Sequence, residues 1–130
     1  MKFSGQILAV KNMKEMISFY CDFLNFEVIT AVPNKDNPEF TILQNENVQI
    51  MLETLESLSK NNPNMNNYFK LTEKFGVGSI NYIKTTDIED LYKTVKENSV
   101  PILKELHETW YGAKEFIIED PEGYLIMFSQ

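Results

Sequence analysis

Few side chains in this sequence are of the kinds that usually do chemistry, and they are scattered. The chain has one cysteine, Cys21, and one histidine, His107. A single thiol can form neither an intramolecular disulfide nor a zinc site built from thiolates. Cys21 has no base beside it in the sequence, so we interpret it as structural. His107 is expected at the surface or at the rim of a site rather than as a metal ligand.

Two aromatic residues are better candidates for contact with a ligand. Trp110 and Tyr111 precede Gly112 in a predicted loop, and their rings can stack on a planar molecule. Each could equally be an ordinary packing residue. The sequence therefore points to binding more than to catalysis.

The charge balance narrows the classes of partner. Acidic residues number 19 and basic residues 12, all of them lysine, and the net charge is −7. This charge disfavours nucleic acid and anionic membranes as partners. It would attract a cationic ligand, although it also simply keeps a protein soluble. No segment resembles a signal peptide or an apolar membrane span of about 18 residues, so a cytoplasmic location is expected.

The elements that must position these side chains are clearest near the end of the chain. Two apolar runs flank Asp120-Pro121-Glu122-Gly123, in which proline and glycine suit a tight turn. This pattern predicts a β-hairpin whose last strand covers 124–128. Alternation along that strand separates one face, formed by Tyr124, Ile126 and Phe128, from the other, formed by Leu125, Met127 and Ser129.

The rest of the chain predicts two similar halves. Asn12 and Glu15 form a capping-box pattern before a helix over 13–24, and Thr86 or Asp87 is expected to cap a second helix. The predicted strands are 3–10, 26–32, 40–43 and 48–52 in the first half, and 80–85, 100–106, 116–119 and 124–128 in the second. Between the halves, 59–67 is expected to be a loop and 67–75 a helix.

An internal duplication accounts for this order. Aligning Asn12 with Asp87 superposes the two helix stripes at an offset of 75 residues, and aligning Glu46 with Glu122 superposes the final strands at an offset of 76. We therefore predict a single α+β domain over 1–130, with two tandem βαβββ modules. Module 1 covers about 1–53, a connector about 54–78, and module 2 about 79–130.

Short motifs in this order resemble the vicinal oxygen chelate superfamily, which includes glyoxalase I, extradiol dioxygenases and bleomycin resistance proteins. In the first half they are Phe19-Tyr20 and Leu24-Asn25-Phe26, where asparagine replaces the usual glycine. In the second half, 86–91, Trp110-Tyr111-Gly112 and 120–125 look like the glyoxalase/bleomycin resistance branch. The resemblance implies paired βαβββ modules forming a curved mixed sheet around a cleft, and a homodimer that shares that cleft.

The metal site of the family's enzymes does not carry over. The resemblance places its ligands on the first and last strand of each module, and these positions hold Gly5, Met51, Ile80 and Met127. Thioether sulfur is too soft for the divalent ions concerned. Moving two residues along brings in Glu53 and Ser129, with Ile7 and Tyr82, and one carboxylate cannot hold a catalytic metal alone. No metal and no cofactor are expected.

The predicted cleft is therefore an apolar floor with a few polar groups, as in many small-molecule sites. Strand alternation and the resemblance assign these residues to it: Ile7, Ala9, Gln49, Met51, Glu53, Ile80, Tyr82, Lys84, Leu125 and Met127, with Trp110 and Tyr111 at its mouth and Tyr68 and Phe69 as an opposing lip. The alternative is that these residues simply pack two sheets together. Gln49 and Glu53 argue against that, because a closed apolar core would leave their polar ends unpaired.

Two functions remain open. The first is a metal-independent binding protein that resembles bleomycin resistance proteins and sequesters a small molecule, cationic or planar, in a dimer cleft. The second is an enzyme of the superfamily, either a metal-dependent glyoxalase-type lyase or dioxygenase, or a metal-free variant that uses Glu53 as a base. The missing ligands and the net charge of −7 favour the first. Resistance to an antibiotic is one role that the resemblance implies.

Overall fold

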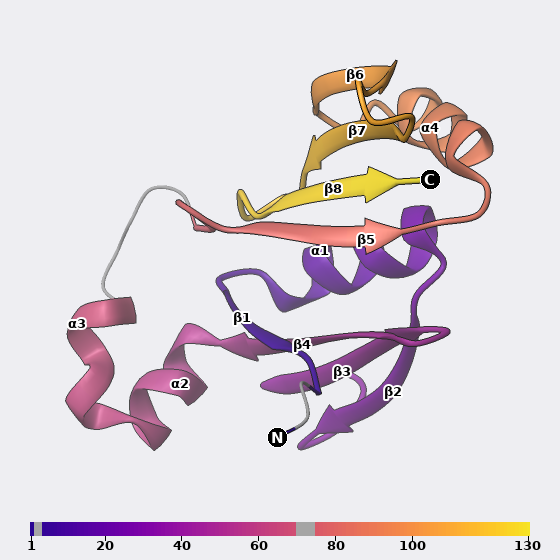
Figure 1. Ribbon diagram of the computed structural model, residues 1–130. Helices are drawn as coiled ribbons and strands as arrows, with labels where there is room; N and C mark the ends of the chain where they lie inside the picture. Colours follow the sequence, from indigo (N-terminus) through magenta and orange to yellow (C-terminus); the bar gives the residue numbers. More distant parts are fainter. Residues whose placement is uncertain (2–3, 70–74) are drawn as a thin grey trace. The chain divides into compact units, whose positions relative to one another are not determined.

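The computed structural model describes residues 1, 4–69 and 75–130 (Figure 1). The chain divides into two compact units, Met1–Glu73 and Lys74–Gln130. Each unit contains one four-stranded sheet. The predicted role of 54–78 as a connector stays a prediction.

Unit 1 has the βαβββ order that the sequence predicts. Its elements are β1 (Gln6–Val10), α1 (Met13–Ser18), a π-helical turn η1 (Phe19–Phe23), β2 (Glu27–Val32), β3 (Phe40–Asn45) and β4 (Val48–Thr54). The strands lie in the order β1-β4-β3-β2, with β1 parallel to β4 and the remaining pairs antiparallel. The parallel pair needs a long connection, which the intervening helix and hairpins supply.

The first helix begins and ends as its residues require. The Asn12 side chain accepts a hydrogen bond from the Glu15 N–H (3.2 Å) and donates one to the Glu15 carboxylate (3.2 Å), which confirms the predicted capping box. At the other end, Asn25 has a φ of 55°. This left-handed conformation favours glycine and is tolerated by asparagine, so the departure from the family's usual glycine keeps the backbone path.

One face of the first sheet packs against α1 (Figure 1). Met16 and Tyr20 are fully buried on the helix side. The buried residues of the sheet occupy alternate positions: Leu8, Val10, Thr41, Leu43, Ile50 and Leu52. Alternation then leaves the neighbouring side chains on the opposite face.

Unit 2 repeats this arrangement. Its elements are β5 (Ile80–Lys84), α4 (Ile88–Glu97), β6 (Ile102–Glu108), β7 (Lys114–Glu119) and β8 (Leu125–Ser129), with the strand order β5-β8-β7-β6. Ile7 pairs with Met51 in the first sheet, and Tyr82 pairs with Met127 in the second. These equivalent pairs differ by the same 75 and 76 residues as the sequence repeat, so the predicted α+β fold with two βαβββ repeats is confirmed.

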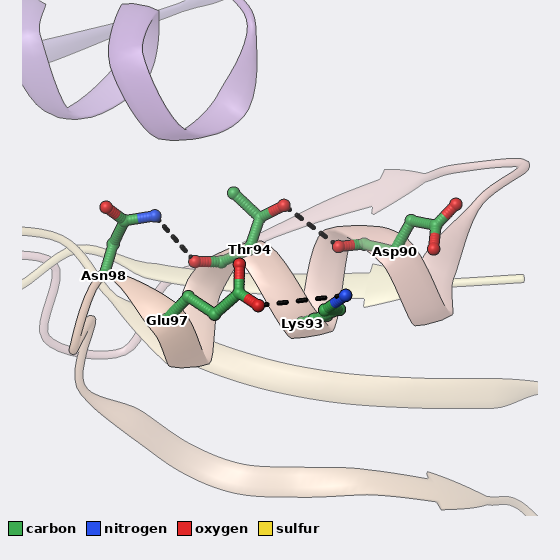
Figure 2. Close-up of polar contacts among 5 residues, drawn as sticks. All are labelled: Asp90, Lys93, Thr94, Glu97 and Asn98. Carbon is green, nitrogen blue, oxygen red and sulfur yellow. Dashed lines mark hydrogen bonds and ion pairs between the residues drawn. The ribbon is translucent and has the colours of Figure 1, made fainter.

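The second helix is capped differently from the prediction. The Asp87 side chain makes no capping hydrogen bond; instead the Ile88 N–H donates to the Gln130 side-chain oxygen (2.9 Å). Along the exposed side of α4, Thr94 donates to the Asp90 carbonyl (3.0 Å) (Figure 2). At its C-terminal end, the Asn98 amide donates to the Thr94 carbonyl (2.9 Å). The remaining contact in that view is an exposed ion pair between Lys93 and Glu97, 3.8 Å apart.

The final hairpin has the predicted turn. Asp120 is buried, and its carboxylate accepts hydrogen bonds from the N–H groups of Glu122 (3.0 Å) and Tyr124 (2.9 Å). Gly123 takes a φ of 95°, which explains why glycine closes this turn. Phe116, Ile118, Tyr124, Ile126 and Phe128 are all buried, in agreement with the predicted faces of the last strand.

The segment after β4 is more helical than expected. It contains α2 (Leu55–Asn61), a 3₁₀ turn η2 (Pro63–Met65) and α3 (Asn66–Phe69), so the prediction of a loop over 59–67 is wrong. Thr54 caps α2 by accepting a hydrogen bond from the Ser57 N–H (3.2 Å), a signal hidden among the polar residues. Positions 70–74 of the helix predicted over 67–75 lie outside the described residues.

Candidate functional site

Each sheet has one face that its own helix does not cover, and the predicted site residues lie there. On the first sheet, Ile7 pairs with Met51 and Ala9 pairs with Glu53, while their strand neighbours Leu8 and Leu52 are buried. We call this the first open face and define it by Ile7, Ala9, Phe40, Ile42, Gln44, Gln49, Met51 and Glu53, which share one side of the sheet by register.

The polar residues of the first open face are hydrogen-bonded within their own unit. Glu53 accepts from the Ser57 hydroxyl (2.7 Å) and from the Asn61 amide (3.4 Å). Gln49 donates to Gln44 (2.8 Å). The sequence argument that these polar ends would lack partners in a packed interior therefore does not hold, since unit 1 supplies the partners itself.

The second open face belongs to unit 2. Ile80 pairs with Leu125, Tyr82 with Met127, and Lys84 with Ser129. We define the second open face by these residues together with the neighbours on β7, namely Ile80, Tyr82, Lys84, Glu115, Ile117, Leu125, Met127 and Ser129. It brings together every residue of module 2 that the sequence assigned to the strands of the cleft.

Glu115 is the one residue of this face that the sequence reasoning missed. It is only 5% exposed, and its carboxylate accepts a hydrogen bond from the Tyr82 hydroxyl (3.3 Å) across the intervening strand β8. The prediction began the strand at Phe116, whereas β7 begins at Lys114. With the strand extended, alternation with Ile117 would have placed Glu115 on the open face.

A tight loop brings a second tyrosine to the same carboxylate. The loop between β6 and β7 is closed by hydrogen bonds between Thr109 and Ala113 (2.7 and 2.9 Å). A hydrogen bond to Glu115 raises the pKa of Tyr111 above its ordinary value. The Tyr111 phenol is therefore protonated at neutral pH and is able to donate this bond.

The other aromatic residues are more exposed. Trp110, at 95% exposure, meets the Tyr111 ring edge to face, with 5.2 Å between the ring centroids. Tyr68, predicted as part of a lip, is exposed on α3. The side chain of Phe69, its predicted neighbour, lies outside the described residues.

The positions that resemble metal-ligand sites hold unsuitable donors. Met51 lies beside Ile7 and Met127 beside Tyr82, while Gly5 precedes β1 and Ile80 pairs with Leu125. Among the described residues, no group of three or more His, Cys, Asp and Glu side chains is placed to hold a metal ion. The donor set thus does not fit the hard or borderline ions of the superfamily's enzymes.

One hollow of about 420 Å³ lies elsewhere in unit 1. Its lining comes from the ends of β1 and β4 and the turn before β3, and consists of Val10, Lys11, Asn37, Pro38, Glu39, Thr54, Leu55 and Glu56. None of the predicted site residues contributes to it. None of the helices in the described part of the chain is long and apolar enough to cross a membrane.

Solved structures of other proteins share this fold. TioX from Micromonospora sp. ML1 aligns with a TM-score of 0.76 at 12% identity, covering 100% of this chain and 98% of that one. A glyoxalase/bleomycin resistance protein/dioxygenase family enzyme from Burkholderia phytofirmans PsJN aligns with a TM-score of 0.78 at 17% identity, covering 97% and 95%. At these identities the likeness shows the fold alone.

Sequence comparisons identify the family. A bleomycin resistance protein from Geobacillus stearothermophilus is 30% identical over 127 residues, covering 95% of this chain and 92% of the relative. A bleomycin resistance protein from Staphylococcus aureus strain MRSA252 matches to the same extent. The sequence profile of the Glyoxalase/Bleomycin resistance protein/Dioxygenase superfamily matches residues 4–128. The chain therefore belongs to the Glyoxalase/Bleomycin resistance protein/Dioxygenase superfamily, and its curated relatives are bleomycin resistance proteins.

Proposed function

We propose that this protein binds a small molecule through its open faces and sequesters it without a metal ion or a chemical step. The observation that carries the proposal is the second open face, where two half-exposed tyrosines converge on one buried carboxylate. Apolar and aromatic walls with few polar groups are typical of small-molecule sites. The name shared by the relatives supports bleomycin, or a molecule like it, as the ligand.

The proposed binding residues are those of the two open faces together with Trp110 and Tyr111. Met51 and Met127 lie on separate sheets, each flanked by an apolar or aromatic neighbour. Methionine side chains adapt to irregular or flat ligands. Sequestration requires affinity alone, which agrees with the lack of a fitting set of metal ligands among the described residues.

The test uses metal-free bleomycin and the fluorescence of Trp110, the only tryptophan. We expect saturable quenching with a dissociation constant in the micromolar range or tighter, or about −8 kcal/mol. Calorimetry gives the stoichiometry. In Trp110→Phe the fluorescence signal should disappear while calorimetry still detects binding. If neither signal changes in the wild-type protein, bleomycin is not the ligand.

A matched preparation treated with EDTA tests the metal-independent part of the proposal. We expect the same affinity before and after treatment, because the paired strand positions carry Ile7, Met51, Tyr82 and Met127 rather than metal ligands. Loss of binding after EDTA, with recovery on adding a divalent ion, would contradict it.

A further inference from the structure

We propose that Glu115, together with Tyr82 and Tyr111, forms a recognition site for a positively charged group carried by a flat aromatic ligand. This inference rests on the proposed small-molecule binding and adds the chemical class of the ligand. It is argued from the burial of one carboxylate, from the placement of the nearest basic side chains, and from the exposed rings around it.

The first step is the environment of the carboxylate. Glu115 is 5% exposed, and the Tyr82 hydroxyl donates to it at 3.3 Å. Tyr111 supplies a second donor. A buried carboxylate is stabilised by hydrogen bonds and by an opposite charge. The two tyrosines provide the hydrogen bonds but no charge.

The second step is that the nearest basic side chains are engaged elsewhere or point away. Lys114, the chain neighbour of Glu115, pairs with Glu89 on α4. Lys84 is exposed on the edge strand, with Ser129 between it and Glu115 in the register. Within residues 4–69 and 75–130, no ion pair joins Glu115 to a lysine or to the histidine.

His107 is the direct register partner of Glu115 on β6. One of its ring nitrogens, Nδ1, lies 3.0 Å from the Glu105 carbonyl oxygen on its own strand. The imidazole therefore interacts with the backbone of β6 rather than with the carboxylate. The positive charge that Glu115 lacks can thus be supplied by a ligand.

The third step concerns the rings. The side chains of Tyr82 and Tyr111 are each about half exposed, and Trp110 is almost fully exposed beside Tyr111. Aromatic faces attract cations, and exposed rings stack on flat molecules. A ligand that combines a cation with an aromatic plane satisfies both the carboxylate and the rings. The net charge of −7 adds a long-range attraction for it.

The experiment compares two probes of nearly the same shape. 9-Aminoacridine is a cation at pH 7.5, whereas acridine is neutral there. Wild-type protein should bind 9-aminoacridine more tightly than acridine. In Glu115→Gln, which keeps the side-chain shape, the affinity for 9-aminoacridine should fall by about tenfold or more, and the affinity for acridine should stay the same.

The matched control is Glu105→Gln. Glu105 is an exposed residue of β6 whose carboxylate lies 4.0 Å from Lys96 of α4, so this change removes the same charge on the helix side of the sheet. It should leave both affinities unchanged. Thermal melting of each variant checks that the fold persists. Tyr82→Leu, at a half-exposed position, is a second variant that should weaken binding of 9-aminoacridine severalfold.

Each outcome decides for or against the site. If Glu115→Gln keeps the preference for the cation, or if wild-type protein binds the two probes equally or not at all, the site is refuted. Titration of the same variants with metal-free bleomycin separates this failure from that of the proposed function. Bleomycin binding without a Glu115-dependent cation preference would remove only the present inference. The reverse result would remove bleomycin and keep the cation site.

Discussion

At the scale of single residues, the chemistry of the second open face depends on Glu115. Most acidic residues of this chain are exposed and contribute only to its overall charge. Glu115 differs because two phenol groups and the strands around it exclude water from its carboxylate. A charge held in this way interacts more strongly with a bound cation than an exposed charge does, since the solvent screens it less.

Cys21 illustrates the opposite situation, a potentially reactive group in an environment that suppresses reaction. Partial burial, followed by the nearby carboxylates of Asp22 and Glu27, raises the pKa of the Cys21 thiol above its ordinary value. The thiolate is the reactive form, and a raised pKa lowers its fraction at neutral pH. We expect iodoacetamide to alkylate Cys21 more slowly at pH 7.5 in the folded protein than in urea.

The control for this prediction is the same reaction on glutathione with and without urea, which corrects for the effect of the denaturant. Within the folded protein, the rate should rise as the pH is increased toward 9. Alkylation at neutral pH that is as fast in the folded chain as in the unfolded one would contradict the expected suppression and reopen a chemical role for Cys21.

At the scale of elements, the two equivalent helices obtain their N-terminal hydrogen bonds in different ways. In unit 1 the cap comes from Asn12, immediately before α1. In unit 2 it comes from Gln130, which is 42 residues beyond the Ile88 N–H that it accepts from. The capping group therefore connects the start of α4 to the chain beyond β8. A local sequence pattern cannot indicate a cap that depends on strand pairing.

This difference predicts unequal effects of two substitutions. Gln130→Ala should lower the free energy of unfolding by about 1 kcal/mol, as for loss of an N-cap. Asp87→Ala should cost less, because the Asp87 side chain makes no capping bond. Urea denaturation of both variants measures the difference. High salt in the buffer screens the interaction of the Asp87 charge with the helix dipole. An equal or larger loss in Asp87→Ala would show that Asp87 is the effective cap.

At the scale of the whole molecule, the duplication is seen in the register of the strands. Equivalent parallel pairs recur after 75 and 76 residues, and each unit has a sheet with one face covered by its helix. The other face of each sheet carries half-exposed apolar residues, among them Ile7 in unit 1 and Ile80 in unit 2. Exposed apolar surface of this kind is common at sites of association or ligand binding.

The homodimer that the family resemblance implies is testable on this scale. Light scattering after size exclusion should give a mass of about twice the 15.2 kDa of the chain. Addition of a bound ligand should leave that mass unchanged if the dimer forms first. A mass equal to one chain at micromolar concentration would contradict the dimer and require each open face to bind its ligand within a single subunit.

The sequence by itself determined the βαβββ repeat, the capping box at Asn12, the turn at 120–123 and the faces of the last strand. These features depend on local backbone preferences and on the period of apolar residues, so they can be read from short segments. The family followed from the same motifs taken in order.

Only the tertiary structure decided which side chains meet. The contact between Tyr82 and Glu115 spans three strands, and the cap from Gln130 links residues far apart in sequence. Both depend on strand order and register, which apolar periodicity does not specify. A one-residue error in the start of β7 was enough to hide Glu115, because each step along a strand moves a side chain to the other face.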